Sequence, residues 1–426
     1  MRIPYVMKPE KWLFSLTLIL LALVLTPFSS FAYSVLTHQA IVDAAWEKNL
    51  KPVLLKHYPD ATEEQLRKAH AHAYGGSIIQ DMGYFPFGNP FFTDLVHYVR
   101  TGDFVENLIT SSKTLDELAF SLGALAHYNA DIYGHPIGTN RAVPIVYPKV
   151  KAKYGNTVTY ADDPVSHIKT EFGFDVLQVA RGNYAPENYR DFIGFEVAPE
   201  VLERAFLETY GIELKDVFVS LPLAIGTYRY TIRGLIPELT KAAWHAKKDE
   251  IMAANPDATH RKFVYRMRMA RYHEQWGNCY DRPNLFTRFT ASIIRVLPKI
   301  GPLKPLALVP PPPEAEKYFM ESFNKTVDAY SVKLKQLESN PKPNLRNLQL
   351  DTGKPIAIGD YKLADETYEK LLLKNSDKDF KHMSTDLREN VIAFYKNEAK
   401  AREKAEDPKQ WEKISEALVK LKALQL

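Results

Sequence analysis

One ten-residue segment, residues 126–135, carries three metal-binding side chains at regular spacing. They are His127, Asp131 and His135, each four residues from the next. Residues four apart lie on the same face of an α-helix, so we expect His127 and Asp131 to point the same way. His135 is expected at or just beyond the end of that helix. Imidazole and carboxylate groups are ligands that zinc accepts in proteins. The segment therefore predicts a helix that presents metal ligands on one face.

A second segment repeats this spacing further along the chain. His167 and Glu171 are again four residues apart, which places both on one face of a helix. Asp163 and Pro164 precede them, and a proline in the first turn is typical of a helix start. We therefore expect a second ligand-bearing helix that begins at this pair.

Helical periodicity also dominates the rest of the chain, and no alternating pattern is long enough to predict a sheet. The predicted fold class is all-α. Thr62 and Thr114 are predicted N-caps, and Thr114 with Glu117 has the sequence of a capping box. Loops are expected at residues 83–90 and 134–154, and two charged helices after residue 360. The other helices predicted are residues 41–55, 61–73, 114–129, 202–210, 224–245 and 315–337.

The N-terminus has the pattern of a secretory signal peptide. A basic start is followed by the apolar residues 12–25, and Ser30 and Ala32 fit the small-residue rule for cleavage. Cleavage there would make Tyr33 the mature N-terminus. The alternative is an uncleaved membrane anchor, but the apolar run is shorter than the ~20 residues a spanning helix needs. We expect export, to the periplasm or outside the cell.

Composition bears on disulfide bonds and on the partners that the protein could bind. Cys279 is the only cysteine, so no intramolecular disulfide can form. The net charge of +4 over 426 residues gives no general argument for binding nucleic acid or an anionic membrane. No specific nucleic-acid or protein partner is predicted.

The candidate ligands follow one another in a characteristic order along the chain. They are Tyr33, His38, Asp81, His97, His127, Asp131, His135, His167 and Glu171. This order resembles the zinc-dependent phospholipase C family, which shares its fold with the fungal single-strand nucleases. The resemblance covers residues 33–190. It implies a helical domain with a trinuclear zinc site at the base of a cleft.

The resemblance also implies a role for each position. Tyr33 would bind through its α-amino nitrogen and carbonyl oxygen, and Asp131 would bridge two metals. His135, His167 and Glu171 would complete the third metal. Asp81 would be a ligand or near-ligand and the catalytic residue that accepts the proton of the attacking water. The chain departs from the family at Tyr33, where Trp is usual, and in a shorter interval between Asp131 and His135.

The function implied is hydrolysis of phospholipids to diacylglycerol and a phosphorylated head group, with peripheral membrane contact. One alternative is a nuclease. The spacing of Tyr33 and His38 favours it slightly, but that branch typically uses disulfides. A second alternative is a non-catalytic, zinc-stabilised envelope protein. The predicted domains are a signal peptide (1–32), a phospholipase C-like helical domain (33–300), and a Pro-rich spacer with C-terminal helices of unknown role (301–426).

Other polar residues near these positions are expected to support the site without being ligands. His70 and His72 are two apart and cannot share a helix face, so we expect them on the surface or behind the ligands. Zinc-bound histidines usually donate their second N–H to a carboxylate or carbonyl. Asp94, Asp162 and Asp163 are candidate acceptors, and the sequence does not choose among them.

Overall fold

The computed structural model describes residues 35–181, 195–254, 309–340, 342–405 and 408–424. These residues form helices and connecting segments, with no β-strand beyond the single bridge between Leu348 and Pro355. The all-α prediction is confirmed. None of the helices in the described ranges combines the length and apolar character that crossing a membrane requires. The signal sequence, Tyr33 and Cys279 lie outside the described residues.

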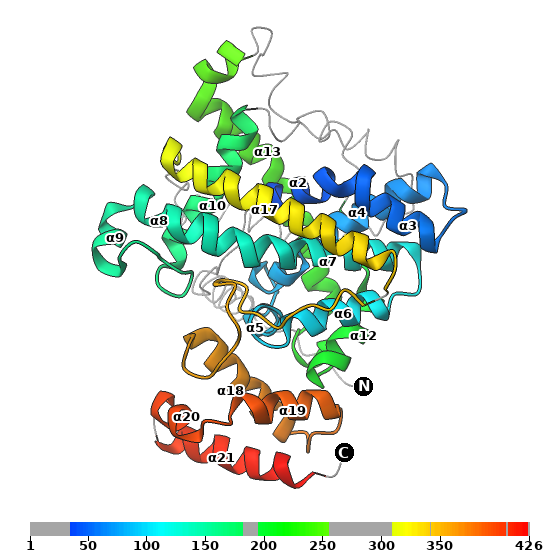
Figure 1. Cartoon of the computed structure of the whole chain (residues 1–426), viewed down its shortest axis with the longest axis vertical. Helices are drawn as coiled ribbons and strands as arrows, with labels where there is room; N and C mark the ends of the chain where they lie inside the picture. The colour runs from blue at the N-terminus through cyan, green and yellow to red at the C-terminus, as the bar shows by residue number, and fades with distance from the viewer. Residues whose placement is uncertain (1–34, 182–194, 255–308, 341, 406–407, 425–426) are drawn as a thin grey trace, which may run out of the picture.

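The N-terminal helices surround one central helix, α7, which spans Leu115–Tyr133 (Figure 1). α17, residues Pro313–Leu337, runs along α7 although nearly two hundred residues separate them in the chain. The other elements up to α13 are α2 (Val35–Ala45), a π-helical turn η1 (Trp46–Leu50), α3 (Lys51–His57), α4 (Glu63–Gly76), a 3₁₀ turn η2 (Ile79–Tyr84), α5 (Pro90–Tyr98), α6 (Thr101–Thr110), a π-helical turn η3 (Gly134–Thr139), α8 (Asn140–Val146), α9 (Pro148–Tyr154), α10 (Pro164–Arg181), α12 (Pro199–Tyr210), a 3₁₀ turn η4 (Leu214–Asp216) and α13 (Leu221–Ala254).

α7 is buried on every side over most of its length. All its residues from Glu117 to Asp131 are buried, and α2, α4, α6 and α17 pack around it. A helix enclosed in this way belongs to the core of a large domain and needs no polar face. It can therefore carry His127 and Asp131 into the interior of the molecule.

Threonine caps start both α4 and α7, as predicted. At α4 the capping box is complete, because Thr62 and Gln65 bond to each other's backbone N–H. At α7 the Thr114 hydroxyl accepts from the Glu117 N–H at 3.2 Å. The predicted capping box is nevertheless wrong there, because the Glu117 carboxylate accepts from Lys113 N at 2.6 Å and from Arg204 instead.

The predicted loop at residues 134–154 is wrong as well. This segment folds as η3, α8 and α9. Its prolines suggested a loop, but Pro148 occupies the first turn of α9, where the missing N–H costs no hydrogen bond. Gly138 allows α17 to approach closely, since a Cβ there would lie 2.6 Å from the Ser322 hydroxyl oxygen.

After α17 the chain crosses the molecule without regular structure and then forms a second group of helices. We call residues 345–361 the strap. Four helices follow it, where the sequence predicted two: α18 (Lys362–Ser376), α19 (Thr385–Phe394), α20 (Glu398–Lys404) and α21 (Pro408–Ala423). α18 packs on α5 (Figure 1). The charged sequence is divided into shorter helices at two places. One is a left-handed turn at Asp379 and Phe380, and the other is the N-cap at Asn397.

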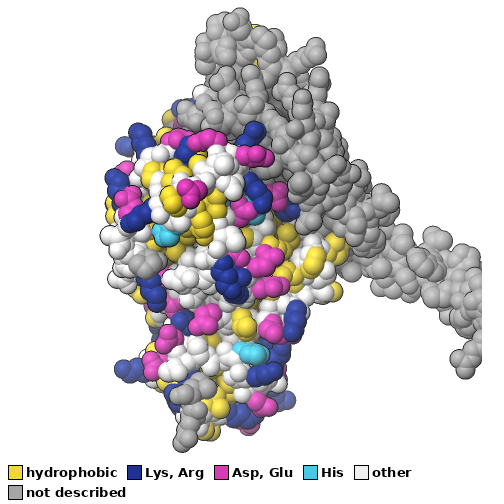
Figure 2. Space-filling model, turned by 90° about the vertical axis from the view of Figure 1, so that its right-hand side faces the viewer, with side chains coloured by type: hydrophobic (Ala, Val, Ile, Leu, Met, Phe, Trp, Pro, Cys, Tyr) yellow, Lys and Arg dark blue, Asp and Glu magenta, His cyan; other side chains and the backbone are white. Residues whose placement is uncertain are grey.

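On the face shown in Figure 2, the described residues form no large surface patch of a single charge sign. Acidic and basic side chains are mixed over it, as the small net charge of +4 would suggest. The view therefore gives no electrostatic argument for a polyanionic partner.

A close helix contact offers a test of this packing. A Cβ added at Gly123 on α7 would lie 2.0 Å from the Ala73 carbonyl oxygen on α4. Gly123→Ala should therefore destabilise the protein by about 1–3 kcal/mol through overpacking, although alanine is the better helix former by about 1 kcal/mol. The urea unfolding midpoint measures this. An unchanged or raised midpoint would mean that α4 and α7 do not pack this closely.

Candidate metal centre

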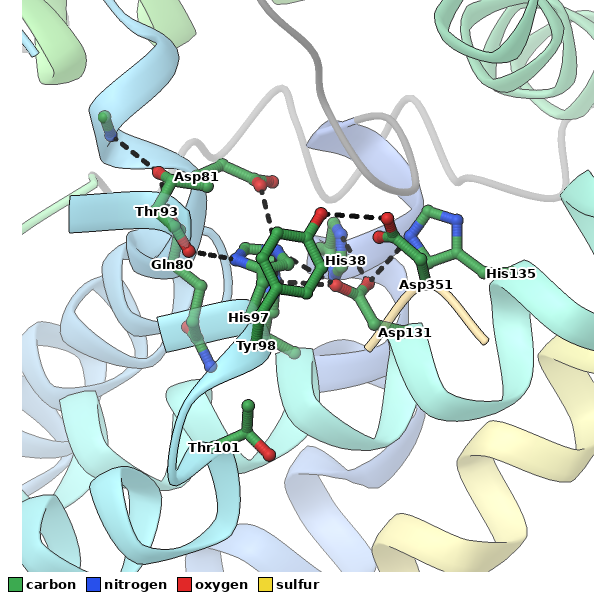
Figure 3. Close-up of polar contacts among 12 residues, drawn as sticks. His38, Gln80, Asp81, Thr93, His97, Tyr98, Thr101, Asp131, His135 and Asp351 are labelled. Atoms are coloured by element: carbon green, nitrogen blue, oxygen red, sulfur yellow. Dashed lines mark hydrogen bonds and ion pairs between the residues drawn. The ribbon is translucent and has the colours of Figure 1, made fainter. Parts of the chain in front are cut away.

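The structure brings eight of the nine predicted ligands into one buried cluster. They come from α2, η2, α5, α7, η3 and α10, and none is more than 2% exposed. Figure 3 shows Asp131 between the histidines of the other elements. The ninth position, Tyr33, lies outside the described residues. The eight are His38, Asp81, His97, His127, Asp131, His135, His167 and Glu171.

Asp131 faces histidines with both of its carboxylate oxygens. Oδ2 lies 3.0 Å from His127 Nε2 and 3.3 Å from His97 Nε2. Oδ1 lies 3.8 Å from His135 Nε2 and 3.9 Å from His38 Nε2. Two ligand atoms on one tetrahedral zinc are about 3.3 Å apart, given bonds of 2.0–2.1 Å. The geometry therefore suits a carboxylate that bridges two ions.

Three groups of side chains have ligand atoms close enough to hold an ion each. Within each group these atoms lie within 4.8 Å of one another. His127 belongs to both of the first two groups. The third group adjoins the first because His135 Nε2 lies 3.8 Å from Asp131 Oδ1. The groups are His38 with His127 and Asp131, Asp81 with His97 and His127, and His135 with His167 and Glu171.

The buried carboxylates fit cations. No hydrogen-bond donor of the described residues is directed at the oxygens of Asp81 or Glu171, which water does not reach. Burying an ionised carboxylate without a partner costs several kilocalories per mole. Burial raises the pKa of Asp81 to about 7 and the pKa of Glu171 well above its usual value. Bound divalent ions would remove this penalty, and the donor set of imidazoles and carboxylates suits zinc.

Asp131 behaves differently because of its histidine neighbours. Burial acts to raise its pKa, but the charge and hydrogen bonding of His127, together with His97, outweigh burial and lower the pKa well below the usual value. Asp131 is therefore ionised within the cluster.

Three of the histidines are oriented by hydrogen bonds from their second ring nitrogen. His97 Nδ1 lies 2.9 Å from the Thr93 carbonyl oxygen, and His127 Nδ1 lies 3.0 Å from that of Ser77. A carbonyl can only accept, so these nitrogens carry the proton and leave Nε2 as the ligand atom.

The structure thus shows which groups accept the second ring N–H of these three histidines, a choice that the sequence left open. Two are carbonyl oxygens, and the third is the Asn140 amide oxygen, 2.8 Å from His167 Nε2. Asp163 instead accepts from Ser166 N at 2.9 Å at the start of α10, and Asp162 accepts from Thr159. The predicted helix start at Asp163 and Pro164 is confirmed.

His70 and His72 lie apart from the three groups. His70 Nε2 is 2.9 Å from Asp43 Oδ1, and its ring stacks on Trp46. His72 Nε2 is 3.5 Å from Asp116 Oδ2. The expected surface location is wrong, because the two are only 9% and 7% exposed. Local carboxylates and the indole ring cover them.

The structure adds polar residues that the sequence did not single out. Asp175 is fully buried on α10 and accepts from Leu36 N at 2.9 Å and Thr37 N at 3.1 Å, which fixes the start of α2. It lies four residues after Glu171, so continuing the four-residue spacing could have found it. Asn140 and Asp351 also lie at the cluster, and no motif marks either.

The all-α fold and the three buried groups define a helical protein with a candidate multinuclear metal centre. Residues 37–218 match the family model described as zinc dependent phospholipase C. This match supports the resemblance to the zinc-dependent phospholipase C family over that stretch of the chain. The comparisons with curated proteins and with solved structures found no match.

The shared position of Asp131 leads to a prediction. Asp131→Asn removes the charge that faces two ion positions, so zinc affinity should fall by more than the ~10–100-fold typical of changes behind the ligands. Chelator competition measures the affinity, and elemental analysis measures zinc per chain. His57→Ala is the control, because His57 is exposed on α3 and bonds only locally to the Val53 carbonyl. Equal zinc binding by the two variants would contradict the bridging geometry.

Proposed function

We propose that this protein is a zinc-dependent phosphodiesterase that hydrolyses phospholipids to diacylglycerol and a phosphorylated head group. One observation carries the proposal: three adjoining groups of buried ligands, two of which share His127, lie within the family-matched residues 37–218. Three adjoining groups suit three zinc ions.

The chemistry follows from the charges that the cluster gathers. When bound, clustered zinc would lower the pKa of a water towards ~7 and act as a Lewis acid on the phosphoryl oxygens. Asp131 would hold two ion positions at a fixed separation through its two oxygens. His97 and His127 are locked by their carbonyl partners, so they need no reorganisation. Asp81 Oδ1, 3.5 Å from His97 Nε2, is the proposed acceptor of the proton from the attacking water.

The proposal extends to the processed N-terminus. Val35 begins α2 one turn before His38, and Asp175 anchors this end of the helix through Leu36 and Thr37. We propose that the signal sequence is removed before Tyr33 and that the new α-amino group adds a ligand beside His38. The protein would then act in the periplasm or outside the cell, with peripheral contact to its lipid substrate.

The substrate class can be tested directly. The metal-loaded chain starting at Tyr33 should release phosphocholine and diacylglycerol from phosphatidylcholine vesicles. A chelator should stop the release, and excess zinc should restore it. His127→Ala should lower the rate at least ~100-fold, since it removes a member of two ligand groups, whereas His57→Ala should match the parent chain.

Two other outcomes have definite meanings. Cleavage of single-stranded DNA without phosphatidylcholine hydrolysis would assign the chain to nuclease-like activity. Full zinc loading without cleavage of either substrate would favour a metal centre that only stabilises the fold. Unchanged hydrolysis by His127→Ala would place the reaction outside this cluster.

The role of the α-amino group has its own test. A chain extended by Gly-Ser before Tyr33 should bind its weakest zinc at least ~10-fold less tightly than the chain starting at Tyr33, because a ligand amine becomes an amide. Chelator competition on both forms measures the difference. Equal affinities would show that the N-terminus is not a ligand.

A further inference from the structure

The strap reaches the metal cluster from outside the family-matched residues. Its residue Leu348 exchanges hydrogen bonds with the Thr101 hydroxyl at 2.8 and 3.0 Å. Two residues on, Leu350 N donates to the carbonyl oxygen of His97 at 3.1 Å. The strap is therefore bonded to the backbone of a candidate ligand.

Asp351 is the strap residue held most firmly at the site. It is 3% exposed, and its Oδ2 accepts from the Tyr98 hydroxyl at 2.8 Å and from the Tyr361 hydroxyl. Figure 3 shows the Tyr98 contact next to the histidine cluster. Two phenol donors on one carboxylate oxygen fix the side chain, and so restrict where its main-chain carbonyl points.

That carbonyl controls the orientation of Asn140. The Asn140 Nδ2 group donates to the Asp351 carbonyl oxygen at 2.8 Å. The other end of the same amide, Oδ1, lies 2.8 Å from His167 Nε2. A flipped amide would place two carbonyl oxygens against each other, so the contact to Asp351 selects the orientation with Oδ1 towards His167.

The amide orientation in turn selects the tautomer of His167. An amide oxygen only accepts, so His167 Nε2 carries a proton, and in the neutral imidazole that binds a metal Nδ1 then presents its lone pair. Nδ1 lies 2.9 Å from Glu171 Oε1, and two lone pairs that face each other at this distance repel unless a cation lies between them. His167 would thus bind through Nδ1, the opposite nitrogen from His97 and His127.

We propose that the strap is part of the metal centre: the Asp351 carbonyl, acting through Asn140, holds His167 in the tautomer that binds zinc at the group with His135 and Glu171. The proposal rests on the zinc cluster proposed above. Asp351 and Asn140 are positioning residues, because they act through His167 and do not themselves belong to a ligand group.

The test uses the full processed chain and measures zinc binding as well as activity. Asn140→Leu should weaken one zinc position about 10–100-fold, as expected for a partner behind a ligand, while the other positions keep their affinity. Tyr98→Phe, which removes one hydroxyl from Asp351, should weaken the same position by a smaller factor. Asn375→Leu is the control for losing a buried amide, because the Asn375 side-chain Nδ2 donates to the Tyr210 and Leu371 carbonyls and not to a ligand.

¹⁵N NMR of the histidine rings in the zinc-loaded parent chain gives an independent measurement. It should show His167 protonated at Nε2 and coordinated through Nδ1. Coordination through Nε2, or unchanged zinc affinity in both Asn140→Leu and Tyr98→Phe, would overturn the proposal. A parent chain that binds no zinc would instead refute the proposed function, so the two failures differ.

Discussion

The structure is organised around a buried carboxylate, Asp131, whose oxygens face four imidazoles within 3.9 Å. Such a group is stable in the interior only if positive charge surrounds it. The four histidines come from α2, α5, α7 and η3. Because Asp131 needs positive charge around it, this one residue fixes the relative position of these four elements. The helical core around α7 serves this arrangement, since an enclosed helix can present polar side chains without contact with water.

The sequence predicts those features of the site that depend on residues close together in the chain. Spacing within one helix is a local property, so His127 with Asp131, and His167 with Glu171, could be predicted as shared faces. The gathering of eight positions came from the family resemblance, because nothing local relates His38 to Asp131. The loop expected at residues 134–154 failed because Pro148 marks a helix start as readily as a break, and packing against α17 decided the outcome.

The contacts that support the ligands were the least predictable part of the site. The sequence offers three aspartates as candidate acceptors, whereas the structure uses the carbonyls of Thr93 and Ser77 and the amide of Asn140. Every residue has a carbonyl, so sequence carries no mark of the one that a histidine will use. Asp351 is unmarked in the sequence for a related reason, since it belongs to a polar stretch without periodicity and contacts Asn140 across more than two hundred residues.

Contacts from distant parts of the chain explain why residues 37–218 are not a self-contained site. α6 begins at Thr101, directly after Arg100 in a left-handed conformation, and the Arg100 side chain does not cap the helix. The backbone N–H groups of Gly102 and Asp103, in the first turn of α6, instead donate to Asn347 Oδ1 of the strap at 3.0 and 3.1 Å. The same strap bonds the His97 carbonyl a few residues on. The segment that caps a helix beside the cluster is thus continuous with the one that orients Asn140. Loosening it would disturb local stability and ligand geometry together.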